Sequence, residues 1–214
     1  MKAMILAAGR GKRMRPLTDT TPKPLLEVHA KPLIAFHLEA LARAGFSEIV
    51  INISWLGEQI RERLGDGVDY GVSIEYSEES EALETAGGIV QVLDRLGRQF
   101  VIVNADVYTD YDFAHLQRSD SAAHLVLVAN PDHHAEGDFA LHDGIVSRQG
   151  ELRFTYAGIA CFKSEFFAGL EPGRRALGPL LFEAAQSNRV TAELFAGEWH
   201  DIGTPERLQA LNDT

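Results

Sequence analysis

The chain of 214 residues has a single cysteine, Cys161, so no disulfide can form within it. Proteins of oxidising compartments commonly depend on disulfides, and one cysteine therefore indicates a reducing compartment. The sequence also lacks an apolar run long enough for a membrane span or for the hydrophobic part of a signal peptide. We therefore expect a cytoplasmic protein with no membrane partner.

Basic residues are scarce: 20 lysines and arginines stand against 31 aspartates and glutamates, giving a formal net charge of −11. General nucleic-acid binding needs a basic face that neutralises phosphates, so the charge balance excludes that class of partner. The cations that are present crowd the first 31 residues, which predicts a small anionic ligand near the N-terminus. These cations are Lys2, Arg10, Lys12, Arg13, Arg15, Lys23 and Lys31.

Linkers, repeats and low-complexity stretches are missing too, so we predict one domain, residues 1–214. Short apolar runs alternate with amphipathic stretches, which is typical of an α/β sheet protein. Strands are predicted at Lys2–Ala8, Glu48–Ile53, Ser73–Tyr76, Phe100–Asn104 and His124–Ala129. Helices are predicted between them, around Leu33–Leu41, Leu56–Leu64 and Ile89–Leu93, with Thr85 as a candidate N-cap of the third.

From about residue 130 the predicted elements become shorter. A loop at 130–134 precedes a hairpin of Phe139–His142 and Ile145–Arg148. Strands follow at Leu152–Phe154, Gly158–Phe162 and Thr191–Phe195, with a helix at Leu180–Ser187. A last helix begins at Pro205, where Thr204 is a good N-cap and proline suits the first helical position.

The string LAAGRGKRMRPLT, residues 6–18, contains a glycine loop of the kind that binds phosphates. A Walker loop requires a glycine where Leu6 stands and a serine or threonine where Arg13 stands, so that motif is excluded. A dinucleotide fingerprint requires a glycine in place of Met14 and a helix directly afterwards, which Pro16 interrupts. That fingerprint fits poorly as well.

The same string, with PKPL at residues 22–25, resembles the signature of the sugar-1-phosphate nucleotidyltransferases. The resemblance covers essentially the whole chain. It implies a Rossmann-like mixed central sheet flanked by helices, the nucleotide-diphospho-sugar transferase fold, with an elaborated sugar-binding half. Residues 1–130 would mainly bind the nucleotide, and residues 131–214 would mainly bind the sugar and supply a second metal ligand.

The nucleotide site follows from this resemblance and agrees with simple chemistry. Glycines let backbone N–H groups approach a triphosphate closely, and they would also allow a flat base to approach the loop at residues 81–88. Arg13 and Lys23 supply positive charge and are the expected catalytic cations. Asp106 is the third residue that we expect to be catalytic. The expected nucleotide-binding residues are Ala8, Gly9, Gly11, Lys12, Arg13, Lys23, Leu83, Thr85, Ala86, Gly87, Gly88 and Asn104.

Two aspartates are expected to hold Mg²⁺. Asp106 follows a buried-type strand, and ligands of open α/β sheets lie beyond the carboxyl ends of strands. Asp201 lies in WHDIGTP, residues 199–205, which is similar to a family motif whose aspartate joins the first on the metal. Carboxylates with triphosphate oxygens are ligands that Mg²⁺ prefers. A turn or helix cap is the other interpretation of Asp106, although Asp110 and Asp112 suit that role better.

The expected sugar-binding residues are Asp138, Gly158 and Ile159, which lie where the family places its sugar segments. Adjacent histidines point in different directions, so we interpret His133 and His134 as loop residues rather than metal ligands. Ala105 and Ala157 depart from the family pattern, which often has glycine at the first position and serine or threonine at the second.

Within the family, the chain is most similar to members that act in peptidoglycan recycling. Their reaction transfers a uridylyl group from UTP to N-acetylmuramate 1-phosphate and releases pyrophosphate. A guanylyl- or thymidylyltransferase acting on a hexose or heptose 1-phosphate, and a non-catalytic sugar-nucleotide sensor, remain alternatives. We expect small-molecule substrates, UTP and a sugar 1-phosphate, and a monomer or a small homo-oligomer.

Overall fold

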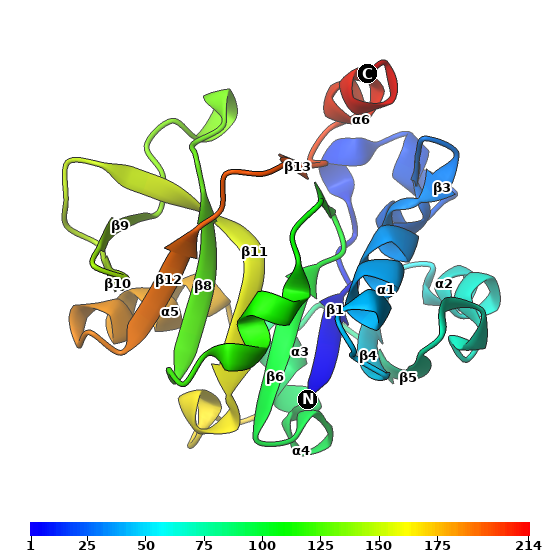
Figure 1. Cartoon of the computed structure of the whole chain (residues 1–214). Coiled ribbons are helices and arrows are strands. Elements are labelled where there is room, and N and C mark those ends of the chain that lie inside the picture. The colour runs from blue at the N-terminus through cyan, green and yellow to red at the C-terminus, as the bar shows by residue number, and fades with distance from the viewer.

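The computed structural model describes residues 1–214, apart from the side chain of residue 118. Among these residues, nine strands form a central sheet in the order β5-β4-β1-β6-β11-β8-β12-β10-β9 (Figure 1). Strands β5, β4, β1 and β6 are parallel, and β11 lies antiparallel between β6 and β8. The strands are β1 (Lys2–Leu6), β4 (Glu48–Ile53), β5 (Ser73–Glu78), β6 (Gln99–Asn104), β8 (Ala123–Val128), β9 (Phe139–His142), β10 (Ile145–Ser147), β11 (Arg153–Lys163) and β12 (Val190–Leu194).

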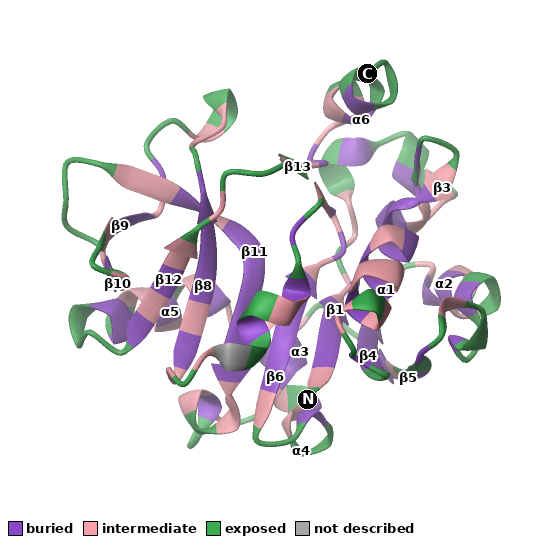
Figure 2. Cartoon of the chain, in the orientation of Figure 1, coloured by how far each residue is buried: buried purple, intermediate pink, exposed green. Residues whose placement is uncertain are grey.

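Helices cover both faces of this sheet, because its central strands are apolar on both sides. In β1, Ile5 packs in a cluster with Leu38 of α1, whereas its neighbour Met4 packs on the other face with Ile89 of α3. Figure 2 shows the central strands mainly in the purple of buried residues. The helices are α1 (Leu33–Arg43), α2 (Gly57–Leu64), α3 (Glu84–Gln91), α4 (Leu93–Leu96), α5 (Leu177–Gln186) and α6 (Pro205–Asn212).

Short 3₁₀ helices occupy many connections, and three of them lie in the segment between β1 and α1. In that segment, prolines and glycines prevent longer helices. The 3₁₀ helices are η1 (Lys12–Met14), η2 (Leu17–Asp19), η3 (Lys23–Leu25), η4 (Val68–Tyr70), η5 (Phe113–Arg118), η6 (Asp132–His134) and η7 (Ser164–Phe167). Of the helices among the described residues, none is long and apolar enough to cross a membrane.

One of two small sheets brings the end of the chain to the carboxyl end of β6. Strand β13 (Trp199–Asp201) pairs antiparallel with β7 (Val107–Thr109), so that Asp201 lies opposite Val107. Strands β2 (Glu27–Val28) and β3 (Lys31–Pro32) form the other sheet. A separate apolar cluster then joins the N-terminal segment to α6, through Met14, Leu26, Val28, Leu33, Ile202, Leu208 and Leu211.

The predicted α/β class is confirmed. The differences concern element boundaries and the short strands β2, β3, β7 and β13, which the sequence analysis did not predict. The two strands predicted at Leu152–Phe154 and Gly158–Phe162 are one strand, β11, because Gly158 at φ 74° absorbs a register shift without ending it. Helix α5 begins at Leu177, three residues earlier than predicted, because Pro179 fits the first helical turn. Strand β1 ends at Leu6, and the next residues form the glycine loop.

The N-terminus of α3 also differs from the prediction. Thr85 lies inside the first turn, and the N-cap position is Leu83, which makes no side-chain capping bond. Gly87 lies in this helix, where the backbone of the 173–175 segment crosses it. The N–H group of Gly87 donates to the carbonyl of Arg175 at 3.1 Å, and a Cβ at Gly87 would lie 2.3 Å from the carbonyl oxygen of Gly173.

We predict that Gly87→Ala destabilises the protein by about 1–3 kcal/mol, because the added methyl group forces the crossing segment away. A glycine-to-alanine change in an open helix stabilises by about 0.5–1 kcal/mol instead. Gly178 in α5 is the matched control, since its Cβ would have no neighbour closer than 3.9 Å. Urea denaturation of both variants measures the difference, and equal stability of the two would contradict the packing argument.

Candidate active site

The glycine loop follows β1 and is held from two sides. The N–H group of Ala7 donates to Oδ1 of Asn52 at 2.8 Å. Gly11 has φ 64°, and a Cβ there would lie 2.9 Å from Cγ2 of Thr18, whose hydroxyl donates to the Gly11 carbonyl. Gly9 differs, because a Cβ there would have no atom within 4 Å. The loop is therefore fixed at both ends and open in the middle.

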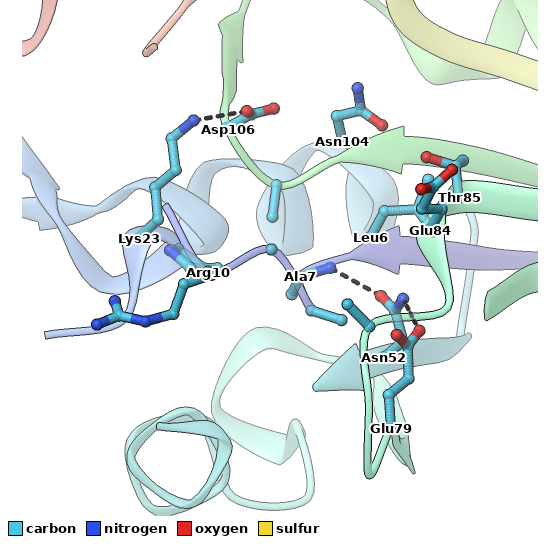
Figure 3. Close-up of a pocket in the computed structure, with 15 residues that line it drawn as sticks. Leu6, Ala7, Arg10, Lys23, Asn52, Glu79, Glu84, Thr85, Asn104 and Asp106 are labelled. Atoms are coloured by element: carbon cyan, nitrogen blue, oxygen red, sulfur yellow. Dashed lines mark hydrogen bonds and ion pairs between the residues drawn. The ribbon is translucent and has the colours of Figure 1, made fainter. Parts of the chain in front are cut away.

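Three adjoining cavities lie at the carboxyl ends of the strands, and Asn104 lines all of them. The glycine-loop cavity, about 330 Å³, lies between the glycine loop and the start of α3 (Figure 3). The α5 cavity, about 430 Å³, is bounded by Asp138, Tyr156 and the N-terminus of α5, and it shares Glu84 and Thr85 with the first. The aspartate cavity, about 350 Å³, is lined by residues that include Arg13, Asp106 and Asp201.

A buried polar network forms part of the lining of the glycine-loop cavity. Asn52 and Glu79 are each only 4% exposed. The amide nitrogen of Asn52 donates to Oε1 of Glu79 at 2.7 Å, and the N–H group of Leu83 donates to Oε2 at 3.0 Å. Figure 3 shows the chain of bonds from Ala7 through Asn52 to Glu79. In this network both carboxylate oxygens of Glu79 accept hydrogen bonds. The carboxylate therefore offers only hydrogen-bond acceptors.

Lys23 and Asp106 form the most buried ion pair around these cavities. Lys23 begins η3 between two prolines, and its side chain is 10% exposed. Its Nζ lies 2.6 Å from Oδ2 of Asp106, which follows β6 directly (Figure 3). The parallel pairing of β1 with β6 places Leu6 beside Asn104, so the glycine loop and Asp106 leave the sheet together.

Asp201 has a positively charged or polar partner on each carboxylate oxygen. Nη1 of Arg207, on α6, lies 2.6 Å from Oδ2 of Asp201. Nε2 of His133, on η6, lies 2.9 Å from Oδ1. The next histidine, His134, lies 3.1 Å from Oδ1 of Asp138, whose Oδ2 accepts the N–H group of Tyr156. The short segment at 130–138 therefore contacts both the aspartate cavity and the α5 cavity.

Burial shifts the pKa values of two side chains near the site. Burial lowers the pKa of His37 from 6.5 to about 4, against smaller raising effects of a bond to the Val107 backbone and of the Asp106 charge. Burial also raises the pKa of the Tyr156 hydroxyl, which has no partner among the described residues. Both side chains are therefore neutral near pH 7.

The site thus combines a glycine loop with cations and aspartates at the ends of the strands. Residues 2–143 match the family model described as nucleotidyl transferase. The chain belongs to the nucleotidyl transferase family. The resemblance read from the glycine loop and the PKPL string is thereby confirmed.

Curated relatives in this family carry several substrate names. An N-acetylmuramate alpha-1-phosphate uridylyltransferase from Neisseria meningitidis serogroup B is 53% identical over 98% of this chain and 96% of its own. A mannose-1-phosphate guanyltransferase from Candida albicans is 37% identical over 96% of this chain. This chain spans only 62% of the length of the Candida protein.

Solved structures agree on the fold. A structure from Bacillus anthracis, described as a glucose-1-phosphate thymidylyltransferase with sucrose, superposes with a TM-score of 0.89 at 23% identity over 100% of this chain and 94% of that one. HddC from Yersinia pseudotuberculosis, with GMP-PN, superposes with a TM-score of 0.82 at 19% identity, covering 99% and 98% of the chains. At such identities these likenesses show the fold alone, and they confirm the predicted nucleotide-sugar transferase fold.

The structure brings some of the predicted nucleotide-binding residues together and leaves others outside. Those that line the glycine-loop cavity are Ala8, Gly9, Lys23, Thr85 and Asn104. Arg13 lines the aspartate cavity beside Asp106 and Asp201 instead. The predicted residues that line none of the three cavities, in the part of the chain that the structure describes, are Gly11, Lys12, Leu83, Ala86, Gly87 and Gly88.

Gly87 and Gly88 were expected to let a base approach, and both also have a reason inside the fold. A Cβ at Gly88 would lie 2.6 Å from Oε1 of Glu79 and 2.9 Å from Nδ2 of Asn52. Gly88 therefore makes room for the buried network, as Gly87 makes room for the crossing backbone.

Among the predicted sugar-binding residues, Asp138 lines the α5 cavity and Gly158 lines the aspartate cavity. Ile159 is fully buried in the apolar core, so its side chain is structural. Gly158 also has an internal reason, since a Cβ there would lie 2.6 Å from Nδ2 of Asn104. The alanines that depart from the family pattern, Ala105 and Ala157, are 2% and 0% exposed.

Sequence reasoning named Arg10 only as one of the N-terminal cations, and it missed Asn52, Glu79 and the contacts of the two histidines. Arg10 lines the glycine-loop cavity, and its guanidinium carbon lies 3.7 Å from the ring centroid of Trp55. A polar residue inside an otherwise apolar strand was the available signal for Asn52. His133 and His134, interpreted as plain loop residues, both line the aspartate cavity. Nothing in the local sequence indicates that His133 meets Asp201, 68 residues away.

We predict that Glu79→Gln destabilises the protein by about 1–3 kcal/mol. An amide at this position sets an NH₂ group against either Asn52 Nδ2 or the Leu83 N–H group, and Asn52 cannot turn because Ala7 holds its oxygen. Glu78→Gln is the matched control, because Glu78 is exposed. Chemical denaturation checks this, and an unchanged midpoint for Glu79→Gln would show that the network is dispensable.

We also expect His37 to make stability depend on pH. Its folded-state pKa of about 4 lies below the ordinary value of 6.5, so its contribution is present above pH 6.5 and is lost as pH falls towards 4. The loss is roughly 3 kcal/mol at most. His37→Gln removes this contribution, so the gap in unfolding free energy between the two proteins should change between pH 7 and pH 4.5. A constant gap would show that His37 titrates normally.

Proposed function

We propose that this protein transfers the uridylyl group of UTP to N-acetylmuramate 1-phosphate, giving UDP-N-acetylmuramate and pyrophosphate. The observation that carries the proposal is the 53% identity, over nearly the full length of both chains, to the uridylyltransferase of that name. Cell-wall recycling is the process such a reaction serves. UTP is a cytoplasmic metabolite, and we propose the same location for the enzyme.

The arrangement of the cavities suits a reaction between two phosphate-bearing substrates. The glycine-loop cavity has open backbone and the cations Arg10 and Lys23, which suit a triphosphate. The α5 cavity has Asp138 for sugar hydroxyls and apolar side chains for a ring. Because the two cavities share Glu84, Thr85 and Asn104, substrates in them would lie side by side.

The acceptor-only carboxylate of Glu79 supports a particular set of bases. Uracil, thymine and guanine each carry a ring N–H group on the pairing edge, and a carboxylate can accept it. Cytosine and adenine present a bare ring nitrogen at that point, which a carboxylate repels. The curated relatives are described with uridylyl and guanylyl chemistry, which agrees with this division. The division excludes CTP and ATP more firmly than it separates UTP from GTP.

The chemistry would depend on positioning and charge. An oxygen of the sugar phosphate attacks the α-phosphorus of UTP, the bond to the β-phosphate oxygen breaks, and pyrophosphate leaves with the bonding pair. The attacking phosphate is already ionised near neutral pH, so no general base is needed. Lys23 would draw the sugar phosphate towards the α-phosphate. Arg13, in the aspartate cavity, would neutralise charge on the phosphates, including the leaving pyrophosphate.

The residues present fit Mg²⁺. Asp106 and Asp201 line one cavity and are hard oxygen ligands. Among the described residues, no group of three or more His, Cys, Asp or Glu side chains forms a complete metal cage. Mg²⁺ commonly takes one or two carboxylates together with substrate phosphates, so two aspartates suffice. When bound, the metal would neutralise phosphate charge as a Lewis acid.

A guanylyltransferase acting on a hexose 1-phosphate is the second candidate. The observation that favours it is the 37% identity to the Candida enzyme, together with the chemistry of Glu79, which suits guanine as well as uracil.

We predict that Asp106→Asn lowers kcat by orders of magnitude while the fold stays intact. The reason is that Asp106 is both a proposed metal ligand and the partner of Lys23, and the substitution removes its charge. Asp112→Asn is the matched control, since Asp112 caps η5 and asparagine caps equally well. Pyrophosphate release and circular dichroism are the measurements. Full activity in Asp106→Asn would remove Asp106 from the catalytic machinery.

We expect pyrophosphate release in the presence of Mg²⁺ only with UTP and N-acetylmuramate 1-phosphate. The measurement is a grid of UTP, dTTP, GTP, CTP and ATP against several sugar 1-phosphates. Turnover with GTP and mannose 1-phosphate instead would support the second candidate. Binding of UTP without turnover in any combination would indicate a sensor.

A further inference from the structure

The two candidate metal ligands are both neutralised by cations of the protein itself. Asp106 has the Lys23 ammonium at 2.6 Å, and Asp201 has the Arg207 guanidinium at 2.6 Å. His133 contacts the remaining oxygen of Asp201 at 2.9 Å. Arg13 lines the same cavity and adds a further positive charge. The carboxylates of Asp106 and Asp201, which line this cavity, face at least three cationic groups. The cavity therefore has no net electrostatic attraction for a metal cation.

Lys23 and a metal would compete for the same carboxylate. The Lys23 side chain is 10% exposed, whereas that of Asp106 is 39% exposed. Asp106 is the partner to which the ammonium of Lys23 donates among the described residues. Displacing the ammonium without giving it another partner would leave a charge in a nearly buried position, which is costly. A metal ion alone offers it no such partner.

A triphosphate does offer one. Lys23 lines the glycine-loop cavity, so phosphate oxygens bound there lie within reach of its ammonium. Arg207 is placed differently, because it belongs to α6, whose N-cap Thr204 accepts the Arg207 N–H group. Gly203 also gives its guanidinium room, since a Cβ there would lie 2.7 Å from Nη1. The exchangeable cation is therefore Lys23, and Arg207 stays on Asp201.

We propose that Lys23 closes this site to free divalent metal, and that metal enters only together with the nucleotide, when phosphate oxygens draw the Lys23 ammonium from Asp106. The inference rests on the proposed function for the identity of the triphosphate. It gives Lys23 a task before the chemical step, in addition to binding the sugar phosphate. It also sets an order of events, with no metal complex of the protein preceding the nucleotide.

The test is calorimetric titration of Mn²⁺ into the whole protein without nucleotide. Wild type should bind Mn²⁺ weakly, and Lys23→Met should bind it roughly tenfold more tightly or better, because a competing charge is removed from the same oxygen. Methionine fills the buried space of the lysine stem. Lys31→Met is the matched control, since Lys31 also pairs with a carboxylate, that of Glu39 at 2.7 Å, but lines none of the three cavities among the described residues. It should behave as wild type.

A second arm measures the nucleotide. Uridine 5′-(α,β-methylene)triphosphate should bind wild type more tightly with Mn²⁺ than without it, and this difference should shrink in Lys23→Met. Lys23→Gln provides a separate check if Lys23→Met fails to fold by circular dichroism, because it also removes the charge from Oδ2 of Asp106, and it should also tighten Mn²⁺ binding without nucleotide. Tight Mn²⁺ binding by the wild-type protein in the absence of nucleotide would overturn the proposal. So would the lack of any gain in Mn²⁺ affinity in either folded variant.

The two proposals fail in different ways. The nucleotide-free titration does not depend on uridylyl transfer, so a gain in Lys23→Met would stand even if the substrate grid showed no turnover. Conversely, turnover with UTP and the muramyl sugar alongside tight binding of free Mn²⁺ by wild type would retain the proposed function and remove the role of Lys23 as a closing cation.

Discussion

The buried chain of hydrogen bonds from Ala7 through Asn52 and Glu79 to Leu83 is the constraint on which the site depends. Four backbone and side-chain groups meet there with every donor matched to an acceptor. Because unpaired polar groups are costly at this depth, the chain fixes the glycine loop, the end of β4 and the start of α3 in one arrangement. The glycine-loop cavity is the space that this arrangement leaves. Gly88 has no side chain because the network passes there.

The charges around Asp106 and Asp201 are also paired. The whole chain has a net charge of −11, whereas in the aspartate cavity Asp106 and Asp201 each meet a cation. Such pairs hold the side chains in place before any ligand arrives, which is the preorganisation that phosphoryl-transfer chemistry needs. They also allow an exchange of partners, because an ammonium group can donate to a phosphate oxygen as well as to a carboxylate oxygen. Lys23 stands where that exchange is possible.

The second half of the chain reaches the site through a small number of contacts. Strand β13 pairs with β7 and brings Asp201 to the turn that follows β6. The 130–138 segment places His133 on Asp201 and His134 on Asp138, so two adjacent side chains contact two different cavities. The backbone at residues 173–175 crosses α3 at Gly87. These contacts make the two predicted halves one structural unit around a shared set of cavities.

Local pattern determined much of this protein. Apolar periodicity was enough for the α/β class and for most strands of the parallel half, and the resemblance of residues 6–18 and 22–25 to a known signature was enough for the family. The catalytic roles of Lys23 and Asp106 stay predictions. Thr204 was recognisable as a cap because capping is a local interaction. Only the tertiary structure decided the rest. Glu79, Arg10 and His133 matter through partners distant in sequence, and Ile159 is a core residue because β11 turns it inward. Gly87 and Gly88 have their meaning from atoms that the sequence does not place nearby, since close approach of two backbones or side chains is a property of the folded chain.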